Sequence, residues 1–175
     1  MEKKSGETIP LLQGANWDAI FAEVNAWRGA CMHHFSMVEM AVTETLLGLS
    51  AVTPDGAAVR LRHLIGQRLE DLTAAITPGG PFGEAGKAAL VELSLYREKH
   101  EAFRSLLCHG VVKVTIERSG QWVLVMRALS IRARQAERNA LALDQDEAQA
   151  ALVALKRDGQ KLASVLGQLR KAVTS

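Results

Sequence analysis

The residues best suited to chemistry lie in one short stretch, "FRSLLCHG", residues 103–110. In it, Arg104 and His109 stand five positions apart, directly before Gly110. A guanidinium binds a phosphate through two parallel hydrogen bonds and stabilises developing negative charge, and an imidazole moves protons near neutral pH. These side chains suit cleavage of a phosphodiester bond in RNA, where the ribose 2′-OH is the nucleophile and no metal ion is required.

Neighbouring polar residues could orient this pair. Glu101, Ser105 and His109 follow one another at four-residue spacing, which predicts a polar stripe on one helix face. Arg104 lies about 140° around an ideal helix from His109, so the two do not share that face. They converge only if the helix ends at His109 or if a second chain meets this edge. Helix capping and a salt bridge between Arg104 and Glu101 would explain the same pattern without catalysis.

A second group of charges follows further along the chain. The net charge of +2 does not by itself indicate a nucleic-acid-binding protein, so a local basic cluster has to be found. The densest cluster consists of Arg127, Arg132, Arg134 and Arg138. It could follow an RNA backbone, or it could be a solvated face.

Other reactive side chains give weaker signals. The chain has no Cys/His pattern with zinc-site spacing, and the adjacent His33 and His34 point different ways on a helix, so we expect no metal or cofactor. Glu39 interrupts an apolar stretch, and it either faces solvent or reaches toward the motif. The only two cysteines, Cys31 and Cys108, lie in apolar helical patterns and are predicted to be buried free thiols.

Three helices should precede the end of the motif. A helical pattern runs from Asn16, a plausible N-cap, toward Leu49, with apolar residues at three- and four-residue spacing. A second helix, with Leu61 and Leu64 on its apolar face, continues to Ile76. The third runs from about residue 84 to the motif, and a Pro- and Gly-rich loop separates it from the second.

After the motif the apolar period changes. Residues 111–129 are rich in β-branched side chains and carry a Ser-Gly pair at their middle, which predicts a β-hairpin. Residues 130–143 fit a strand, a helix or both. Asp144 and Glu147 then form an Asp-x-x-Glu start signal for a last amphipathic helix.

The length fits one domain, which we place at residues 16–175 after a flexible lead-in of residues 1–15. The N-terminus lacks an apolar signal core, and no apolar run is long enough to span a membrane. We therefore expect a cytoplasmic protein without a membrane partner. The predicted fold class is mainly α, with four to five helices and a small β-hairpin inserted before the last one.

A third helix that ends in Arg-polar-x-x-x-His, followed directly by glycine and a hairpin, resembles the HEPN superfamily. The matching residues are Arg104, Ser105 and His109, and the opening helix "FSMVEMAVTETLLGL" and the closing amphipathic helix are also similar to that fold. The resemblance covers roughly residues 16–172, although only the short motif is diagnostic. It implies a HEPN-like helical bundle.

The resemblance also implies a function. Many HEPN domains are metal-independent ribonucleases, often toxins or defence effectors, and they dimerise so that two copies of the motif face one cleft. On this basis Arg104 and His109 would be catalytic, with Ser105 and Glu101 as orienting residues and RNA as the partner. Ser105 stands where the family frequently has Asn or Asp. An antitoxin or another protein partner is a further implication. Other members are non-catalytic, so the alternative is an RNA-, nucleotide- or protein-binding module.

Overall fold

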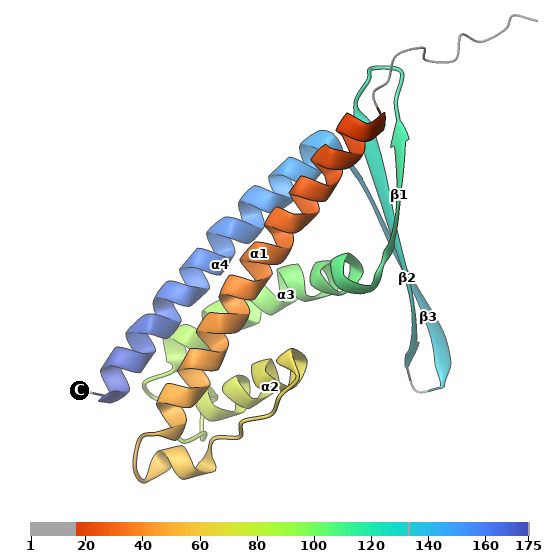
Figure 1. Ribbon diagram of the computed structural model, residues 1–175. Coiled ribbons are helices and arrows are strands. Elements are labelled where there is room, and N and C mark those ends of the chain that lie inside the picture. Colours follow the sequence, from red (N-terminus) through yellow and green to blue (C-terminus); the bar gives the residue numbers. More distant parts are fainter. Residues whose placement is uncertain (1–16, 133, 175) are drawn as a thin grey trace, which may run out of the picture.

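The computed structural model describes residues 17–132 and 134–174; the predicted lead-in and the N-cap Asn16 lie outside the described residues. In chain order the elements are α1 (Trp17–Ser50), the short 3₁₀ helix η1 (Asp55–Ala58), α2 (Ile65–Ile76), α3 (Lys87–His109), β1 (Val111–Ile116), β2 (Trp122–Arg132), β3 (Gln135–Asp144) and α4 (Gln145–Thr174). The described chain is mainly helical, as predicted, with four α-helices and a small antiparallel sheet before the last one (Figure 1).

The two longest helices, α1 and α4, lie side by side and run in the same direction (Figure 1). The indole Nε1 of Trp27 donates to the carbonyl of Ala148, 2.8 Å away. Further along, a Cβ on Gly159 would lie 3.0 Å from Cγ2 of Val38, so the helices approach closely there because glycine has no side chain. Both pairs join residues at the same sequence separation, as parallel helices require.

The apolar stripes predicted for the first and last helices form the centre of the core. In α1 the buried residues include Phe35, Val38, Val42, Leu46 and Leu49. In α4 they include Leu155, Leu162, Leu166 and Leu169, with Leu152 partly buried beside them. Each stripe follows the helical period, so both helices bury one face and expose the other.

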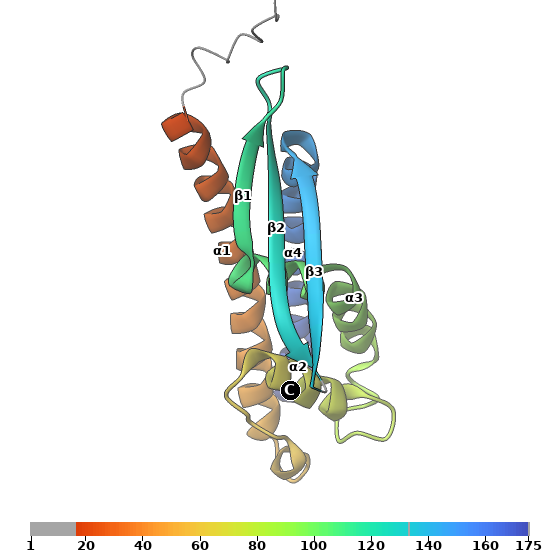
Figure 2. The same cartoon turned by 90° about the vertical axis from the view of Figure 1, so that its right-hand side faces the viewer.

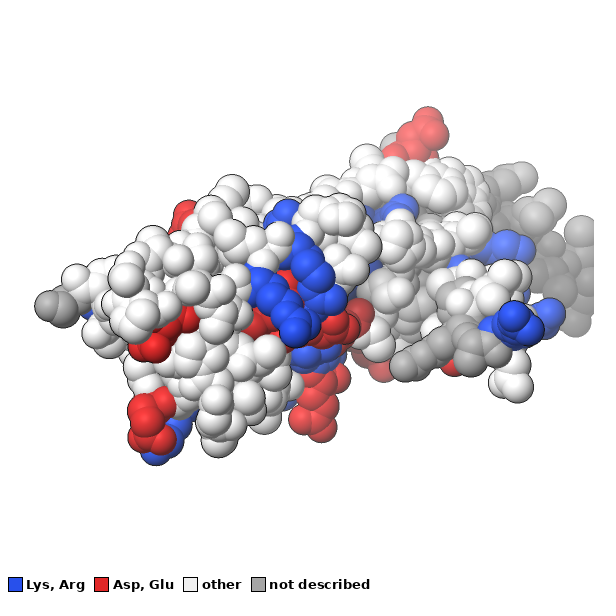
Figure 3. Space-filling view, turned by 90° about the horizontal axis from the view of Figure 1, so that it is seen from below, with Lys and Arg blue, Asp and Glu red and all other residues white. Residues whose placement is uncertain are grey.

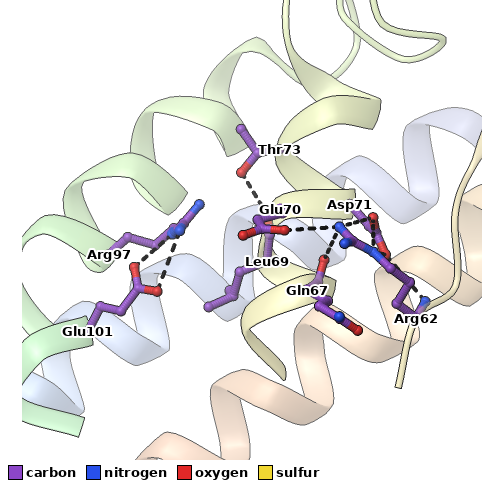
Figure 4. Close-up of polar contacts among 8 residues, drawn as sticks. All are labelled: Arg62, Gln67, Leu69, Glu70, Asp71, Thr73, Arg97 and Glu101. Atoms are coloured by element: carbon purple, nitrogen blue, oxygen red, sulfur yellow. Dashed lines mark hydrogen bonds and ion pairs between the residues drawn. The ribbon is translucent and has the colours of Figure 1, made fainter. Parts of the chain in front are cut away.

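The start of the second helix was predicted wrongly. Leu61 and Leu64 are each 54% exposed, and α2 begins only at Ile65. A polar contact fixes the segment before it: Arg62 donates from Nε and Nη2 to the carboxylate of Asp71, at 2.6–3.0 Å (Figure 4). The Asp71 side chain is 1% exposed, and its hydrogen bonds with Arg62 lower its pKa. The backbone before α2 is therefore fixed by the contact of Arg62 with Asp71, and the two leucines stay exposed.

The predicted hairpin is confirmed and extended by a third strand. β1 and β2 pair from Val111↔Arg127 to Ile116↔Trp122, and Gly120 in the turn has φ 88°, a value that glycine adopts without strain. Of residues 130–143, which fit a strand or a helix, residues 130–132 extend β2 and residues 135–143 belong to β3, which pairs antiparallel with β2. The sheet order is therefore β1-β2-β3.

One face of the sheet packs on the helices and the other is uncovered, as Figure 2 shows. Trp122, Leu124 and Met126 alternate along β2 and are all buried, so they mark the covered face. β3 leads directly into α4, whose first turn is capped as predicted. The Glu147 amide donates to Asp144 Oδ1 at 2.8 Å, and the Asp144 amide donates to Glu147 Oε2 at 3.0 Å.

The two cysteines differ in environment. Cys31 is a buried free thiol, as predicted, and burial raises its pKa to about 12. The prediction was wrong for Cys108, which is exposed. Cys108 lies in the last turn of α3 beside the buried Leu107 but on an exposed side of the helix, and its Sγ is 3.8 Å from Sδ of Met32.

Candidate functional site

The motif occupies the last two turns of α3, which end at Gly110. The cap residue Gly110 has φ −80° and ψ 142°, so it is extended rather than left-handed. Glycine is needed there for a different reason: a Cβ at this position would collide with the carbonyl oxygen of Leu106 and lie 3.5 Å from the carbonyl oxygen of Arg127. The backbone after His109 is therefore held close to β2.

Arg104 is held by an acid from another helix. Its Nε and Nη2 both lie 2.7 Å from Oε1 of Glu39 in α1. The two side chains are 27% and 31% exposed, so the pair is neither buried nor fully solvated. Glu39 therefore reaches toward the motif, the question that the sequence left open. Of the guanidinium donors, only the Nε N–H makes a hydrogen bond within the described part of the chain, and its acceptor is Glu39.

Glu101 takes a different partner from the one the spacing suggested. Arg97, one turn earlier in α3, donates from Nε to Glu101 Oε2 at 3.0 Å (Figure 4). The salt bridge considered between Arg104 and Glu101 is replaced by two separate pairs, Arg104 with Glu39 and Arg97 with Glu101. Glu101 is exposed, so it belongs to a solvated i, i+4 pair.

Ser105 and His109 are both exposed, which agrees with a shared polar face. Arg104 instead turns toward α1 and is only partly exposed. No hydrogen bond joins Arg104 to His109 within the described part of one chain. The structure thus brings Arg104 together with Glu39 and leaves Ser105 and His109 open to a ligand or a partner.

Sequence reasoning missed Arg28, which contributes from α1 to the end of α3. Its Nη2 donates to the carbonyl oxygen of Leu107 at 3.3 Å, one of the last-turn carbonyls that lack a helical partner. Arg28 precedes Glu39 by eleven residues, which places both within about 20° on the same face of α1. The eleven-residue spacing in the sequence therefore indicates that Arg28 and Glu39 share a helix face. This face of α1 carries the contacts to the last turns of α3.

A hydrogen bond between largely buried side chains joins α3 to α4 one turn before Arg104. His100 is 6% exposed, and its Nε2 lies 3.1 Å from Oδ2 of Asp158. Arg157 and Lys99 also pair with this carboxylate, at 2.8 and 3.5 Å. The hydrogen bond from Arg157, then that from His100, lowers the pKa of Asp158 to about 2. The neighbouring cavity, of about 480 Å³, is walled partly by Phe103.

The arginines predicted to bind RNA lie on the long ribbon of β2 and β3. Arg127, Arg134 and Arg138 are exposed, whereas the side chain of Arg132 lies outside what the structure describes. Arg134 follows the end of β2 with φ 65°. On the helical body, by contrast, basic and acidic side chains lie next to one another, as Figure 3 shows.

Other classes of site are absent from the part of the chain that the structure describes. Across residues 17–132 and 134–174, no group of three or more His, Cys, Asp or Glu side chains could hold a metal ion. Within the same ranges no helix is both long and apolar enough to cross a bilayer. Comparison of the chain with protein-family models, with curated proteins and with solved structures found no match.

Proposed function

We propose that this protein is a metal-independent endoribonuclease of the HEPN type, which acts as a homodimer with a composite Arg/His site. The observation that carries the proposal is the Arg104 guanidinium, held at 2.7 Å by Glu39 and still 27% exposed, five residues before the exposed His109 at the helix end. Because Glu39 already restricts the Arg104 side chain, binding of a phosphate to it costs less conformational entropy. A toxin or defence role, with an antitoxin as partner, belongs to the same proposal.

Each residue then has a definite task. His109 of one chain takes the proton of the ribose 2′-OH, and the 2′ oxygen forms a bond to phosphorus. The bond from phosphorus to the 5′ oxygen breaks, and the same His109 then gives that oxygen the proton it took from the 2′-OH. Arg104 stabilises the negative charge that builds up on the non-bridging oxygens. The products are a 2′,3′-cyclic phosphate and a free 5′-OH.

A second chain is part of the proposal because of the helix geometry. On one helix, Arg104 and His109 point about 140° apart. Two helix ends facing each other would allow Arg104 of one copy and His109 of the other to approach the same phosphate. Ser105 shares the exposed face with His109 and supplies a hydroxyl that can bind a phosphate oxygen. Glu39 acts on Arg104 and is a positioning residue.

The direct test is cleavage of RNA by the purified protein in EDTA. His109→Ala should lose the activity and keep the helical circular dichroism spectrum, while His63→Ala, another exposed histidine, should cleave as the wild type does. The products should carry 2′,3′-cyclic phosphate ends. Equal cleavage by His109→Ala and the wild type would refute the assignment, and so would a strict need for a divalent metal.

The positioning role of Glu39 has its own test. Glu39→Gln should lower kcat by about tenfold to a hundredfold, because Arg104 loses the charged acceptor that orients it. Glu39→Asp should recover part of that loss. A change confined to KM, with kcat unaltered, would indicate that Glu39 does not act through the chemical step.

The composite site can be tested by mixing variants. Arg104→Ala and His109→Ala are each expected to be inactive alone, and a mixture that exchanges subunits should regain partial activity. Failure to regain activity, when mass measurement shows mixed dimers, would refute the shared site. If the wild type binds RNA with strong salt dependence and never cleaves it, the protein is a non-catalytic RNA-binding module instead.

A further inference from the structure

The ribbon formed by β2 and β3 extends beyond the rest of the sheet. β1 reaches only as far as the pair Val111↔Arg127, whereas β2 and β3 continue to pair from Ala128↔Asn139 to Arg132↔Gln135. We call residues 128–132 and 134–139 the arm. Figure 1 shows the arm standing apart from the helices. A two-stranded ribbon alone is marginally stable in water, so a ligand that packs on the arm would stabilise it.

The register assigns the arm two different faces. Since Met126 is buried on the covered face, alternation puts Arg127, Leu129 and Ile131 on the opposite, outer face. Arg138 pairs with Leu129 and therefore lies on this outer face as well. Leu129 is 69% exposed and Ile131 82%. The outer face thus combines two cations with two large apolar side chains that no described residue covers.

The charge of this segment differs from that of the rest of the chain. Residues 127–138 contain four arginines and one glutamate, which gives a net charge of +3. The whole chain has a net charge of +2, so all other residues together carry −1. Positive charge is therefore concentrated on the arm and its root, which favours a polyanion as the ligand.

The arm begins beside the motif. Arg127, at its root, lies opposite Val111, and Val111 follows His109 by only two residues. From this point the arm continues for five residues of β2, or about 17 Å at 3.3 Å per residue. That length equals about five stacked nucleotides at 3.4 Å each. A strand of RNA bound along the outer face as far as Arg127 would therefore end beside Val111, two residues after His109 in the chain.

We infer that the outer face of the arm binds single-stranded RNA next to the phosphate that is cleaved, an inference that rests on the proposed ribonuclease function. Arg127 and Arg138 contact phosphates, and Leu129 and Ile131 pack on bases. Unpaired bases expose apolar faces to such side chains, whereas a duplex hides them and offers mainly phosphate and sugar. The arm therefore selects unpaired RNA and positions it for cleavage.

The test measures binding and needs no catalysis. In full-length protein carrying His109→Ala, we would measure the fluorescence anisotropy of a single-stranded oligonucleotide and of a duplex of equal length over a range of salt concentrations. Arg138→Ala should weaken binding and reduce the salt slope by about 0.7, because one phosphate of the single strand is no longer neutralised. Arg118→Ala, in the other turn of the same sheet, is the matched control and should change neither quantity.

The apolar residues make a separate prediction. Ile131→Ser should weaken single-strand binding by about fivefold while leaving the salt slope unchanged, because it removes packing on a base and no charge. An equal effect of Arg118→Ala, or tighter binding of the duplex, would overturn the inference. So would arm variants that bind RNA normally and change only the mass of the assembly, because the arm would then contact protein. Arm-dependent binding without cleavage by the wild type would refute the ribonuclease proposal and leave RNA binding by the arm intact.

Discussion

Replacing Asp158 by Asn should destabilise the protein in a way that depends on pH. Asp158 in α4 accepts from His100 in α3 at 3.1 Å and pairs with Arg157 and Lys99. The substitution keeps the size of the side chain and removes its charge. It leaves His100, which is 6% exposed, without the carboxylate that accepts its hydrogen bond. The contact between α3 and α4 just before the motif is therefore weakened.

The magnitude follows from the pKa of Asp158, which is lowered from 3.8 to about 2. A difference of this size corresponds to about 2.4 kcal/mol at neutral pH. Arg157 supplies the largest part and is 68% exposed, so solvent screening reduces the expected loss to about 1–2 kcal/mol. Because the folded pKa lies below the unfolded value, this stabilisation is complete above the unfolded pKa. It is lost as the pH falls through the folded pKa, with about half gone near pH 3.

The assay is urea unfolding of wild type and Asp158→Asn, followed by circular dichroism at several pH values. The difference in unfolding free energy should be largest at neutral pH and shrink steadily below about pH 4. Glu98→Gln, an exposed carboxylate on α3, is the control and should show almost no difference at any pH. If the difference in unfolding free energy between wild type and Asp158→Asn stays constant at the lowest pH values measured, the electrostatic explanation is refuted.

Two further predictions concern parts of the fold away from the motif. Arg62→Ala should lower the unfolding free energy clearly more than loss of its exposed partner does, because it leaves the buried carboxylate of Asp71 without its cation. Glu70→Gln, which removes only the exposed partner of Arg62, should cost less than about 1 kcal/mol, and similar losses from both would contradict this assignment. In a thiol-labelling assay, Cys108 should react in the native protein and Cys31 only after unfolding; rapid labelling of both would show that Cys31 is accessible.

Local sequence patterns predicted most of the helical fold. The apolar stripes of α1 and α4, the capping box of Asp144 and Glu147, and the turn at Gly120 each depend on residues a few positions apart. Helical and strand periods, caps and turns are local properties, so a single sequence can reveal them. The sequence does not identify the third strand because residues 135–140 are all exposed, and alternating burial is the signal that identifies a strand.

The chemical content of the motif was also readable from the sequence, because Arg104, Ser105 and His109 lie within one helix end. The sequence did not indicate which side chains form hydrogen bonds or ion pairs with the residues of this helix end. Glu39 is 65 residues from Arg104, and Asp158 is 58 from His100. Ion pairs over such separations form only when packing brings α1, α3 and α4 together. The sequence alone thus determined which side chains are available and on which helix face they lie; the tertiary structure decided their partners, because charged side chains pair with whatever opposite charge the packed helices place within reach.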